Sequence, residues 1–245
     1  MLTKNNAKFI KSLQLKKYRQ KETLFIVEGE KNTVELLRSN YEIQQIVCSQ
    51  AFLSKYEQLV KQHTAELIIA EPKQIQQLGT YKTNEQAVAI VKEPKEKKEI
   101  GSGFQILLDD IRDPGNLGTI IRIADWYGIK QVICSETTAE FFNPKTISAS
   151  MGSIFRTDLI RTDLGPLLKS RQKKSYGALL DGRNIHQMKF PKEGYILIGN
   201  ESNGIKEELI PLVDEAITIP RLGAAESLNA AIATGIICDN IFRNS

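Results

Sequence analysis

The sequence predicts an α/β protein in two parts: a small α/β domain, then a larger α/β domain with a mostly parallel sheet and helices on both faces. Short apolar runs alternate with helical patterns along the chain. The stretch Lys92–Gly103, rich in charge and closing on Gly-Ser-Gly, interrupts this alternation. After it, the runs are almost continuously apolar, as in parallel strands buried on both faces. The expected parts are residues 1–98, a linker at 99–103 and residues 104–245.

The first part is expected to carry a basic helical arm in front of a small sheet. Residues 1–21 hold seven basic residues and no acid, which suits contacts with nucleic-acid phosphates. A solvated helix face would give the same pattern. The predicted strands are Leu24–Val27, Ile43–Cys48, Leu67–Ala70 and Ala87–Val91, and the predicted helices are Lys31–Ser39, Ala51–Gln62 and Lys73–Leu78. The candidate RNA contacts in the arm are Lys4, Lys8, Lys11, Lys16, Lys17 and Arg19.

The second part is expected to contain five strands and four helices in alternation. The strands are short and apolar, and the last helix is rich in small apolar residues, which is typical of a buried helix. The predicted strands are Phe104–Leu108, Gln131–Cys134, Ala178–Leu180, Tyr195–Ile198 and Ala216–Ile219. The predicted helices are Leu117–Tyr127, Thr146–Phe155, Pro166–Lys173 and Ser227–Arg243.

Composition excludes several classes of protein. Hydrophobic residues make up 41% and charged residues 25%, which is ordinary for a globular chain. No apolar run reaches about 18 residues, and the basic N-terminal segment lacks the apolar core of a secretory signal. Cys48, Cys134 and Cys238 are far apart, and the histidines are His63 and His186, so neither a disulfide framework nor a metal centre is expected. We expect a cytoplasmic protein without membrane contact.

Polar residues follow the expected strands at their carboxyl ends, where ligands bind in open α/β sheets. After the first strand of the second part, Pro114 and Gly115 form a turn. Asn116 is expected to cap a helix that begins near Leu117. Arg122 lies less than two helical turns further on. It either projects near the helix start or is an ordinary surface charge.

Two more strand ends carry candidate ligand groups. Gly199 after the fourth strand allows close approach of a ligand, and Glu201 can accept hydrogen bonds from a sugar or an arginine. After the fifth strand, a loop of small residues leads to Ser227, the expected N-cap of the last helix. Free N–H groups there can meet a carboxylate or a phosphate. Each loop could equally be a plain polar connection.

The sequence lacks the motifs of several common enzymes. No G-x-G-x-x-G follows the first strand of the second part, and no G-x-x-x-x-G-K-[ST] occurs. No G-x-S-x-G elbow is present either. A dinucleotide-binding site, a P-loop NTPase and a serine hydrolase are therefore unsupported.

Three segments together carry a specific resemblance. NLGTIIRIAD at 116–125, IGNESNG at 198–204 and IPRLGAAESLNAA at 219–231 resemble, in this order, the SpoU (TrmH-like) branch of the SPOUT RNA 2′-O-ribose methyltransferases. The segment NPKTISASMGSIF at 143–155 is also similar to the family. The resemblance runs from Phe104 onward. The first 95 residues resemble, more weakly, the ribosomal-protein-like substrate-binding domain that often precedes it.

The resemblance implies a fold, a cofactor and a partner. Family members thread the chain into a deep trefoil knot, bind S-adenosylmethionine in its loops and form homodimers with the site completed across the interface. The apolar last helix fits such burial. The implied cofactor-binding residues are Leu180, Ile198, Gly199, Asn200, Glu201, Ile219 and Leu228. The implied catalytic or substrate-positioning residues are Asn116, Arg122, Glu201, Ser227 and Asn229.

The implied chemistry is an in-line displacement, in which a ribose 2′-oxygen attacks the sulfonium methyl group without a metal. The family assigns the base to the position of Arg122. Because a guanidinium has a pKa above about 12, we expect Arg122 instead to bind the adjoining phosphate and to polarise the hydroxyl. Asn116 would orient Arg122, and Ser227 and Asn229 would shape the ribose site.

The target RNA is less constrained. A substrate-binding domain in front favours ribosomal RNA, of the large subunit, over tRNA. Methylation of a base and a non-catalytic role in RNA binding or ribosome assembly are the alternatives. The sequence does not specify the methylated nucleotide, nor whether methylation confers antibiotic resistance.

Overall fold

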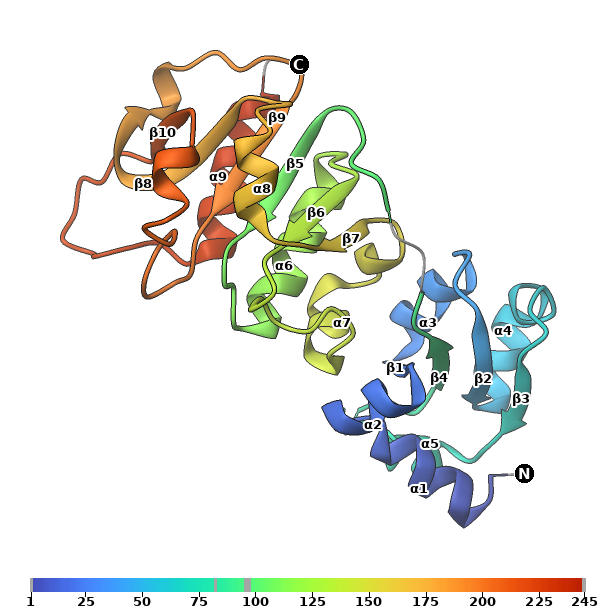
Figure 1. Cartoon of the computed structure of the whole chain (residues 1–245). Helices are drawn as coiled ribbons and strands as arrows, with labels where there is room; N and C mark the ends of the chain where they lie inside the picture. The colour runs from blue at the N-terminus through green and yellow to red at the C-terminus, as the bar shows by residue number, and fades with distance from the viewer. Residues whose placement is uncertain (1, 82, 95–97, 244–245) are drawn as a thin grey trace. The chain divides into compact units, whose positions relative to one another are not determined.

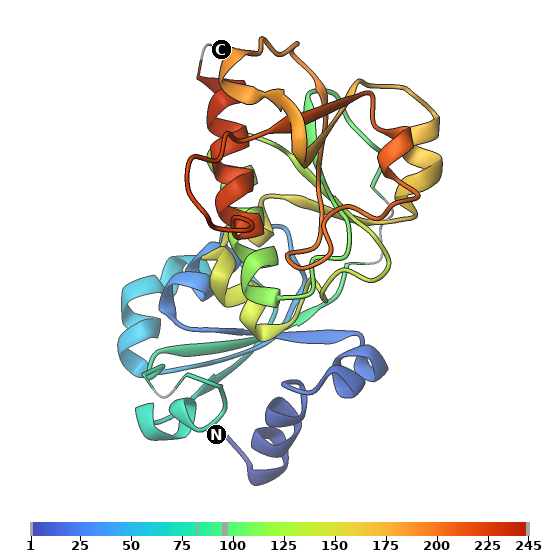
Figure 2. The same ribbon diagram turned by 90° about the vertical axis from the view of Figure 1, so that its left-hand side faces the viewer.

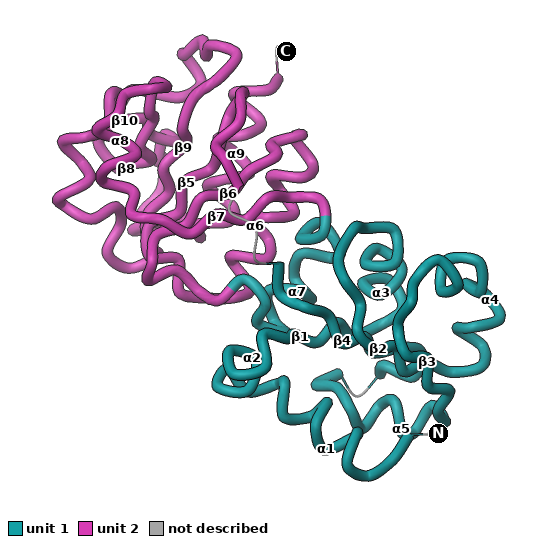
Figure 3. The backbone as a smooth tube through the Cα atoms, turned by 45° about the vertical axis from the view of Figure 1, so that its right-hand side comes forward, with its two compact units in different colours: residues 1–96, 141–155 teal, residues 97–140, 156–245 magenta. Residues whose placement is uncertain are grey.

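The computed structural model describes residues 2–81, 83–94 and 98–243, which divide into two compact units (Figure 3). Unit 1 contains residues 1–96 and 141–155, and unit 2 contains residues 97–140 and 156–245. The division near residue 96 lies beside the linker expected at 99–103. Residues 141–155, which the sequence places within the second part, belong to unit 1, so the two units do not follow the chain order.

Unit 1 is built on a four-stranded mixed sheet in the order β1-β4-β2-β3 (Figure 1). β4 is antiparallel to β1 and to β2, and β2 is parallel to β3. All four strands were predicted, each to within one residue of its observed ends. Their bounds are β1 Leu24–Glu28, β2 Ile43–Cys48, β3 Glu66–Ile69 and β4 Ala87–Lys92.

The basic arm of unit 1 forms two helices that are anchored to the sheet. Ile10 and Leu13 are fully buried in the core that also contains strand residues of the sheet. Arg19 is buried as well, and its Nη1 donates to the carbonyl oxygens of Leu13 at 2.9 Å and Gln14 at 2.7 Å. The prediction that Arg19 contacts RNA is therefore wrong, because its guanidinium serves the fold. The other five predicted contacts, Lys4, Lys8, Lys11, Lys16 and Lys17, are exposed.

The helices of unit 1 are α1 Lys4–Ser12, α2 Lys16–Glu22, α3 Glu30–Leu37, α4 Gln50–Val60, α5 Pro72–Gln76, α7 Pro144–Ser150 and the 3₁₀ turn η1 Ser153–Phe155.

Aromatic packing explains why residues 141–155 belong to unit 1. The ring of Phe142 stacks on that of Phe25 in β1 with centroids 4.2 Å apart. The ring of Phe155 meets the edge of Tyr41 at 5.4 Å. Such pairs add about 0.5–1.5 kcal/mol beyond the burial of their apolar area. This segment is consequently part of the core of unit 1.

Unit 2 is built on a six-stranded sheet in the order β10-β8-β9-β5-β6-β7, in which every pairing is parallel. Five strands were predicted. The sixth, Asp158–Arg161, was missed because it is a short edge strand with charged residues at both ends and no apolar run. The bounds are β5 Phe104–Leu108, β6 Gln131–Cys134, β7 Asp158–Arg161, β8 Ser175–Asn184, β9 Gly194–Ile198 and β10 Glu215–Thr218.

Helices cover both faces of this sheet, which confirms the predicted α/β class. Leu164 and Leu168 of α8 pack against Leu107 and Ile133 on one face. α6 and α9 lie together on the opposite face (Figure 2). The helical elements are α6 Pro114–Trp126, α8 Leu164–Lys169, α9 Ala230–Phe242 and the 3₁₀ turns η2 Ile185–Gln187 and η3 Ile210–Leu212. The trefoil knot stays a prediction, since strand order and pairing do not define how a chain is threaded.

Candidate active site

The candidate site lies at the carboxyl edge of the unit 2 sheet. β5 and β9 end in register, with Leu108 opposite Ile198, and β8 and β10 run in the same direction. The segments that leave these strands therefore emerge at one edge. Two of these segments are the β9 loop, residues 199–204, and the β10 loop, residues 219–229.

Helix α6 begins at a different cap from the one predicted, which leaves the side chain of Asn116 free for another contact. Asp113 is the N-cap, and its carboxylate accepts a hydrogen bond from the backbone N–H of Asn116 at 2.9 Å. The prediction of Asn116 as the cap was wrong, although Pro114 signalled the true start, because proline favours the first helical position. The carboxamide of Asn116 is instead free to donate to Glu201 Oε1 at 2.6 Å.

The start of α9 also differs from its prediction. Asn229, and not Ser227, is the N-cap, and its Oδ1 accepts from the N–H groups of Ala231 at 3.0 Å and Ile232 at 3.3 Å. Both residue types are good caps, so the local sequence does not distinguish them. The other end of the same carboxamide, Nδ2, donates to Asn116 Oδ1 at 2.9 Å.

These contacts join three of the five predicted catalytic residues in one hydrogen-bonded chain. Asn229 donates to Asn116, and Asn116 donates to Glu201. We call this set the polar triplet. Its members come from three segments that are far apart in the sequence, one in each of the three motifs. Because Asn116 is held from both ends, its orientation is fixed by its partners.

The β9 loop is held tightly by its own hydrogen bonds. Asn200 Oδ1 accepts from the N–H groups of Ser202 at 2.9 Å and Asn203 at 3.1 Å, and Asn200 Nδ2 donates to the carbonyl of Asp110 at 2.7 Å. A Cβ on Gly199 would lie 2.2 Å from the backbone of Gly204. Glycine is therefore required at 199 by the loop's own packing, and not only by the approach of a ligand.

Sequence reasoning missed one residue of this edge. Asp110 has a left-handed backbone (φ 58°), its carbonyl receives Asn200, and its carboxylate lies 2.9 Å from Arg112 Nη2. Burial opposes its ionisation, yet Arg112, Thr137 and Lys206 together hold the pKa of the Asp110 carboxyl below its ordinary value. The paired aspartates directly after a buried strand were the available signal.

The predicted cofactor residues fall into buried and exposed sets. Ile198 is buried, whereas Leu180 is 72% and Leu228 46% exposed, and Ile219 is half-buried. Leu180 is exposed because β8 bulges: Ala216 pairs with Gly177 but the next residue, Ile217, pairs with Arg183. Exposed leucines beside a strand end offer an apolar surface that a ligand can cover.

Arg122 and Ser227 do not join the polar triplet. Both are exposed, and within the described chain neither side chain makes a hydrogen bond or ion pair. Arg122 shares its exposed face of α6 with Thr119 and with Trp126, which is 83% exposed. The structure therefore leaves the guanidinium available to a ligand.

The described residues offer no cluster of metal ligands, and two of the cysteine thiols are weak nucleophiles. Among the described residues, no group of three or more histidine, cysteine, aspartate or glutamate side chains could hold a metal ion. Burial raises the pKa of Cys134 and of Cys238 to about 12, which makes both thiols poor nucleophiles at neutral pH. The helices described here are also too short or too polar to cross a membrane.

Comparison with known proteins identifies the family. A model of the SpoU rRNA Methylase family matches residues 103–239. The chain belongs to this family. A model of the MRM3-like substrate binding domain matches residues 4–89, which lie in unit 1. The family match includes the three segments that form the polar triplet.

Full-length relatives support the assignment. The chain is 31% identical to the 23S rRNA (guanosine(2553)-2′-O)-methyltransferase RlmP of Bacillus subtilis, over 93% of this chain and 92% of the relative. It is 28% identical to the 23S rRNA (uridine(2479)-2′-O)-methyltransferase of Streptomyces viridochromogenes, over 98% and 91%. The AdoMet-bound rRNA methyltransferase of Sinorhizobium meliloti superposes with a TM-score of 0.87 at 28% identity, covering 98% of this chain and 95% of that one.

Proposed function

We propose that the protein transfers a methyl group from S-adenosylmethionine to a ribose 2′-oxygen of ribosomal RNA. The observation that carries the proposal is the polar triplet, which joins the three family segments at the ligand-binding edge of the sheet. Relatives along the whole chain are 23S rRNA 2′-O-methyltransferases. We infer from them that the substrate is large-subunit rRNA, and hence that the protein acts in the cytoplasm.

The residues at this edge fit S-adenosylmethionine. Residues 220–229 are all exposed, so their backbone groups are accessible to the polar edge of an adenine. Leu180 and Leu228 present apolar side chains that could pack on its faces. When bound, the cofactor supplies a methyl group that is already activated as a sulfonium. The protein's task is then to position the 2′-hydroxyl and to help remove its proton.

The polar triplet positions the site, and Arg122 meets the substrate. A carboxamide held from both ends loses little conformational freedom when substrate binds. Alignment of the 2′-oxygen, the methyl carbon and the sulfur by the whole site can lower a barrier by about 7–11 kcal/mol in favourable cases. The planar Arg122 guanidinium can hold a phosphate with two parallel hydrogen bonds. From there it polarises the 2′-hydroxyl and stabilises the developing oxyanion. The Glu201 carboxylate can accept the hydroxyl proton directly or through water, and Ser227 lines the ribose site.

The methylated nucleotide is set by features outside this chemistry. The two relatives act on a guanosine at position 2553 and a uridine at position 2479, so the same core serves different bases. Specificity must then come from RNA contacts away from the reacting ribose. The exposed lysines of α1 and α2 are the first candidates for placing the RNA, because phosphate contacts fix its register and orientation without reading a base.

We further infer that two copies form a homodimer through α6 and α9. These helices pack on each other, yet Trp126 of α6 is 83% and Ile232 of α9 57% exposed. Large apolar side chains at such exposure are typical of an interaction surface. Sedimentation of the wild type should give a dimer. Trp126→Glu should give monomers with an unchanged circular-dichroism spectrum, and a wild-type monomer would exclude this interface.

The function is tested with tritium-labelled S-adenosylmethionine and total RNA from a strain that lacks the gene, followed by mapping of the labelled nucleotide. Label in a large-subunit ribose supports the proposal. Label in tRNA, or on a base, would overturn the substrate or the chemistry. Cofactor binding without label in any RNA would favour a non-catalytic RNA-binding factor.

Arg122 is tested in the same assay. Arg122→Ala should lower turnover about 10²- to 10³-fold, the usual cost of removing one transition-state donor, with cofactor affinity unchanged. Arg122→Lys keeps the charge and removes the fork, so it should recover only part of the rate. Near-normal turnover of the lysine variant would exclude any need for a guanidinium.

A further inference from the structure

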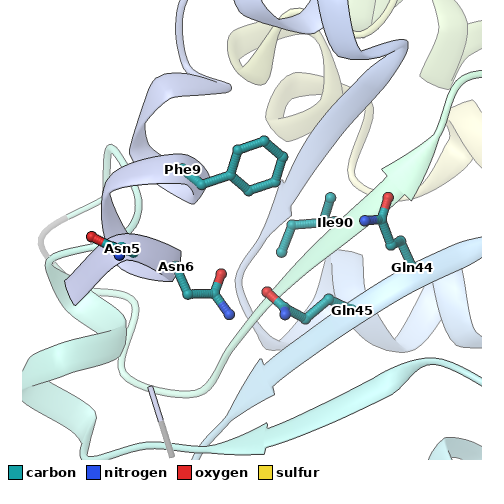
Figure 4. A pocket seen from close by; sticks show the side chains of 6 residues that line it. All are labelled: Asn5, Asn6, Phe9, Gln44, Gln45 and Ile90. Carbon is teal, nitrogen blue, oxygen red and sulfur yellow. The ribbon is translucent and has the colours of Figure 1, made fainter. Parts of the chain in front are cut away.

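A second candidate binding site lies in unit 1, apart from the residues of the methyl-transfer site. Helix α1 and the strands β2 and β4 line a pocket of about 330 Å³ that is open to solvent. This lies within the roughly 300–1,000 Å³ range of small-molecule sites. We call it the α1 pocket (Figure 4). It is lined by Asn5, Asn6, Phe9, Gln44, Gln45 and Ile90.

The lining combines one aromatic ring with four carboxamides and no charge. Figure 4 shows Phe9 of α1 over Ile90 of β4, with Asn6 and Gln45 facing each other across the opening. Phe9 is only half-buried, and Ile90 beneath it is 1% exposed. The pocket therefore has an apolar floor, an aromatic wall and a polar rim.

The carboxamides are free to bind a ligand. Within the described chain, the side-chain amides of Asn5, Asn6 and Gln44 make no hydrogen bond. Gln45 donates its Nε2 to Glu66 at 2.6 Å, which fixes the group and leaves its Oε1 as an acceptor. A carboxamide offers two donors and an acceptor side by side, which matches the edge of a nucleobase.

Positive charge adjoins the α1 pocket. Lys4 and Lys8 precede Asn5 and Phe9 in α1, so each lies on the neighbouring face of the helix, and both are exposed. Such lysines can hold the phosphates on either side of a base that enters the pocket. A ring for stacking, amides for the base edge and cations for the backbone are the elements by which proteins bind unpaired nucleotides.

We propose that the α1 pocket binds one unpaired nucleobase of the RNA substrate, stacked on Phe9 and hydrogen-bonded by Asn6, Gln44 and Gln45. The inference rests on the proposed function for the identity of the RNA, and it adds a base-reading site to that function. Such a site would help this chain to select its own nucleotide among relatives that share the chemistry.

The test measures binding of the full-length protein to single-stranded RNA of about ten nucleotides, a length within the span of single-strand sites. Four homopolymers and a ribose-phosphate chain without bases are compared, with free nucleosides as competitors. The variants are Phe9→Leu, which keeps an apolar side chain against the core, Phe9→Tyr, which keeps the ring, and Gln44→Ala, which is exposed and leaves the core intact. Lys8→Gln is the control for phosphate contact.

Phe9→Leu should weaken binding to at least one homopolymer by about fivefold or more, with Phe9→Tyr close to the wild type. Gln44→Ala should change the preference among the four bases. Neither variant should alter affinity for the chain without bases, nor the salt dependence. Lys8→Gln should reduce the salt slope by about one, equally for all RNAs.

Other outcomes overturn the proposal. Equal losses with and without bases would mean that Phe9 only supports the fold. Competition by nucleosides at the affinity of the RNA would make the ligand a free metabolite. The methyl-transfer assay separates the two proposals. If the wild type methylates rRNA and Phe9→Leu binds RNA as well as the wild type does, only the proposal for the α1 pocket is excluded. If Phe9→Leu weakens binding only to RNA that carries bases, but the wild type methylates no RNA, only the proposed function is excluded.

Discussion

The β9 loop and the β10 loop emerge at the same edge of the sheet, yet they are built differently. In the β9 loop, Asn200 and Gly204 exchange two backbone hydrogen bonds of 2.9 Å, and the Asn200 side chain makes three more. In the β10 loop, every residue from 220 to 229 is exposed, and Arg221 donates one internal hydrogen bond, to the carbonyl of Ala225.

The difference separates what the chain organises by itself from what a ligand must organise. The β9 loop presents Glu201 from a fixed frame, and the polar triplet ties that frame to α6 and α9. The β10 loop keeps its backbone groups available, so a bound cofactor can order it. The preformed β9 loop aligns the reacting groups, and the open β10 loop lets the cofactor enter.

The largest expected contrast is in amide hydrogen exchange with and without S-adenosylmethionine. At a cofactor concentration one hundred times Kd, amides of the β10 loop that bind the ligand should exchange up to about 100-fold more slowly. Amides of the β9 loop, which already have internal partners, should change by less than about threefold. Equal slowing of both loops would show that the β9 loop is not preformed.

Glycine substitutions test the same contrast through stability. Gly199→Ala places a Cβ 2.2 Å from the Gly204 backbone, so the loop must shift, at a cost of about 2–3 kcal/mol. For a protein of this size that lowers Tm by about 4–12 °C. Gly223→Ala in the β10 loop is the matched control, because a Cβ there meets nothing within 4 Å. Calorimetry of both variants should show a large shift for the first and almost none for the second.

Much of this frame could be predicted from the sequence, but not the contacts that complete it. The run Phe104–Leu108, apolar except for Gln105, matches β5 residue for residue, because burial on both faces keeps a strand almost entirely apolar. The cap of α9 could not be chosen by local rules, since Ser227 is as good as Asn229. For α6, Pro114 was a local signal that favoured Asp113 over Asn116. The burial of Arg19 and the docking of residues 141–155 in unit 1 depend on distant contacts that leave no local pattern.

Asn229 has two duties that substitutions can separate. Asn229→Asp keeps the acceptor that caps α9 and removes the Nδ2 donor to Asn116. Its stability should match the wild type, while turnover falls about tenfold because the polar triplet is broken. Asn229→Ala removes both duties and should also lose about 1 kcal/mol of stability. An aspartate variant with full activity would show that the triplet does not position the reacting groups.

The smallest effect concerns the strands that carry the open loop. Glu215, the first residue of β10, accepts from Lys174 at 2.6 Å and Arg183 at 3.2 Å. The hydrogen bond from Lys174, followed by that from Arg183, outweighs burial and lowers the pKa of the Glu215 carboxyl. A carboxyl whose pKa is lower in the folded state stabilises the fold at pH values above its unfolded pKa of about 4.3. That stabilisation is lost as the pH falls through the folded value.

Glu215→Gln should therefore lower the free energy of unfolding by less than about 1 kcal/mol at pH 7, because its partners are partly solvated. The difference from the wild type should shrink as the pH falls below about 4.3 and vanish once both states are protonated. Glu226→Gln in the β10 loop is the control, since Glu226 is exposed and makes no ion pair within the described chain. Urea titrations of the three proteins between pH 3 and pH 7 measure this. If the difference in unfolding free energy between Glu215→Gln and the wild type persists at low pH, Glu215 stabilises the strands by packing and not by its charge.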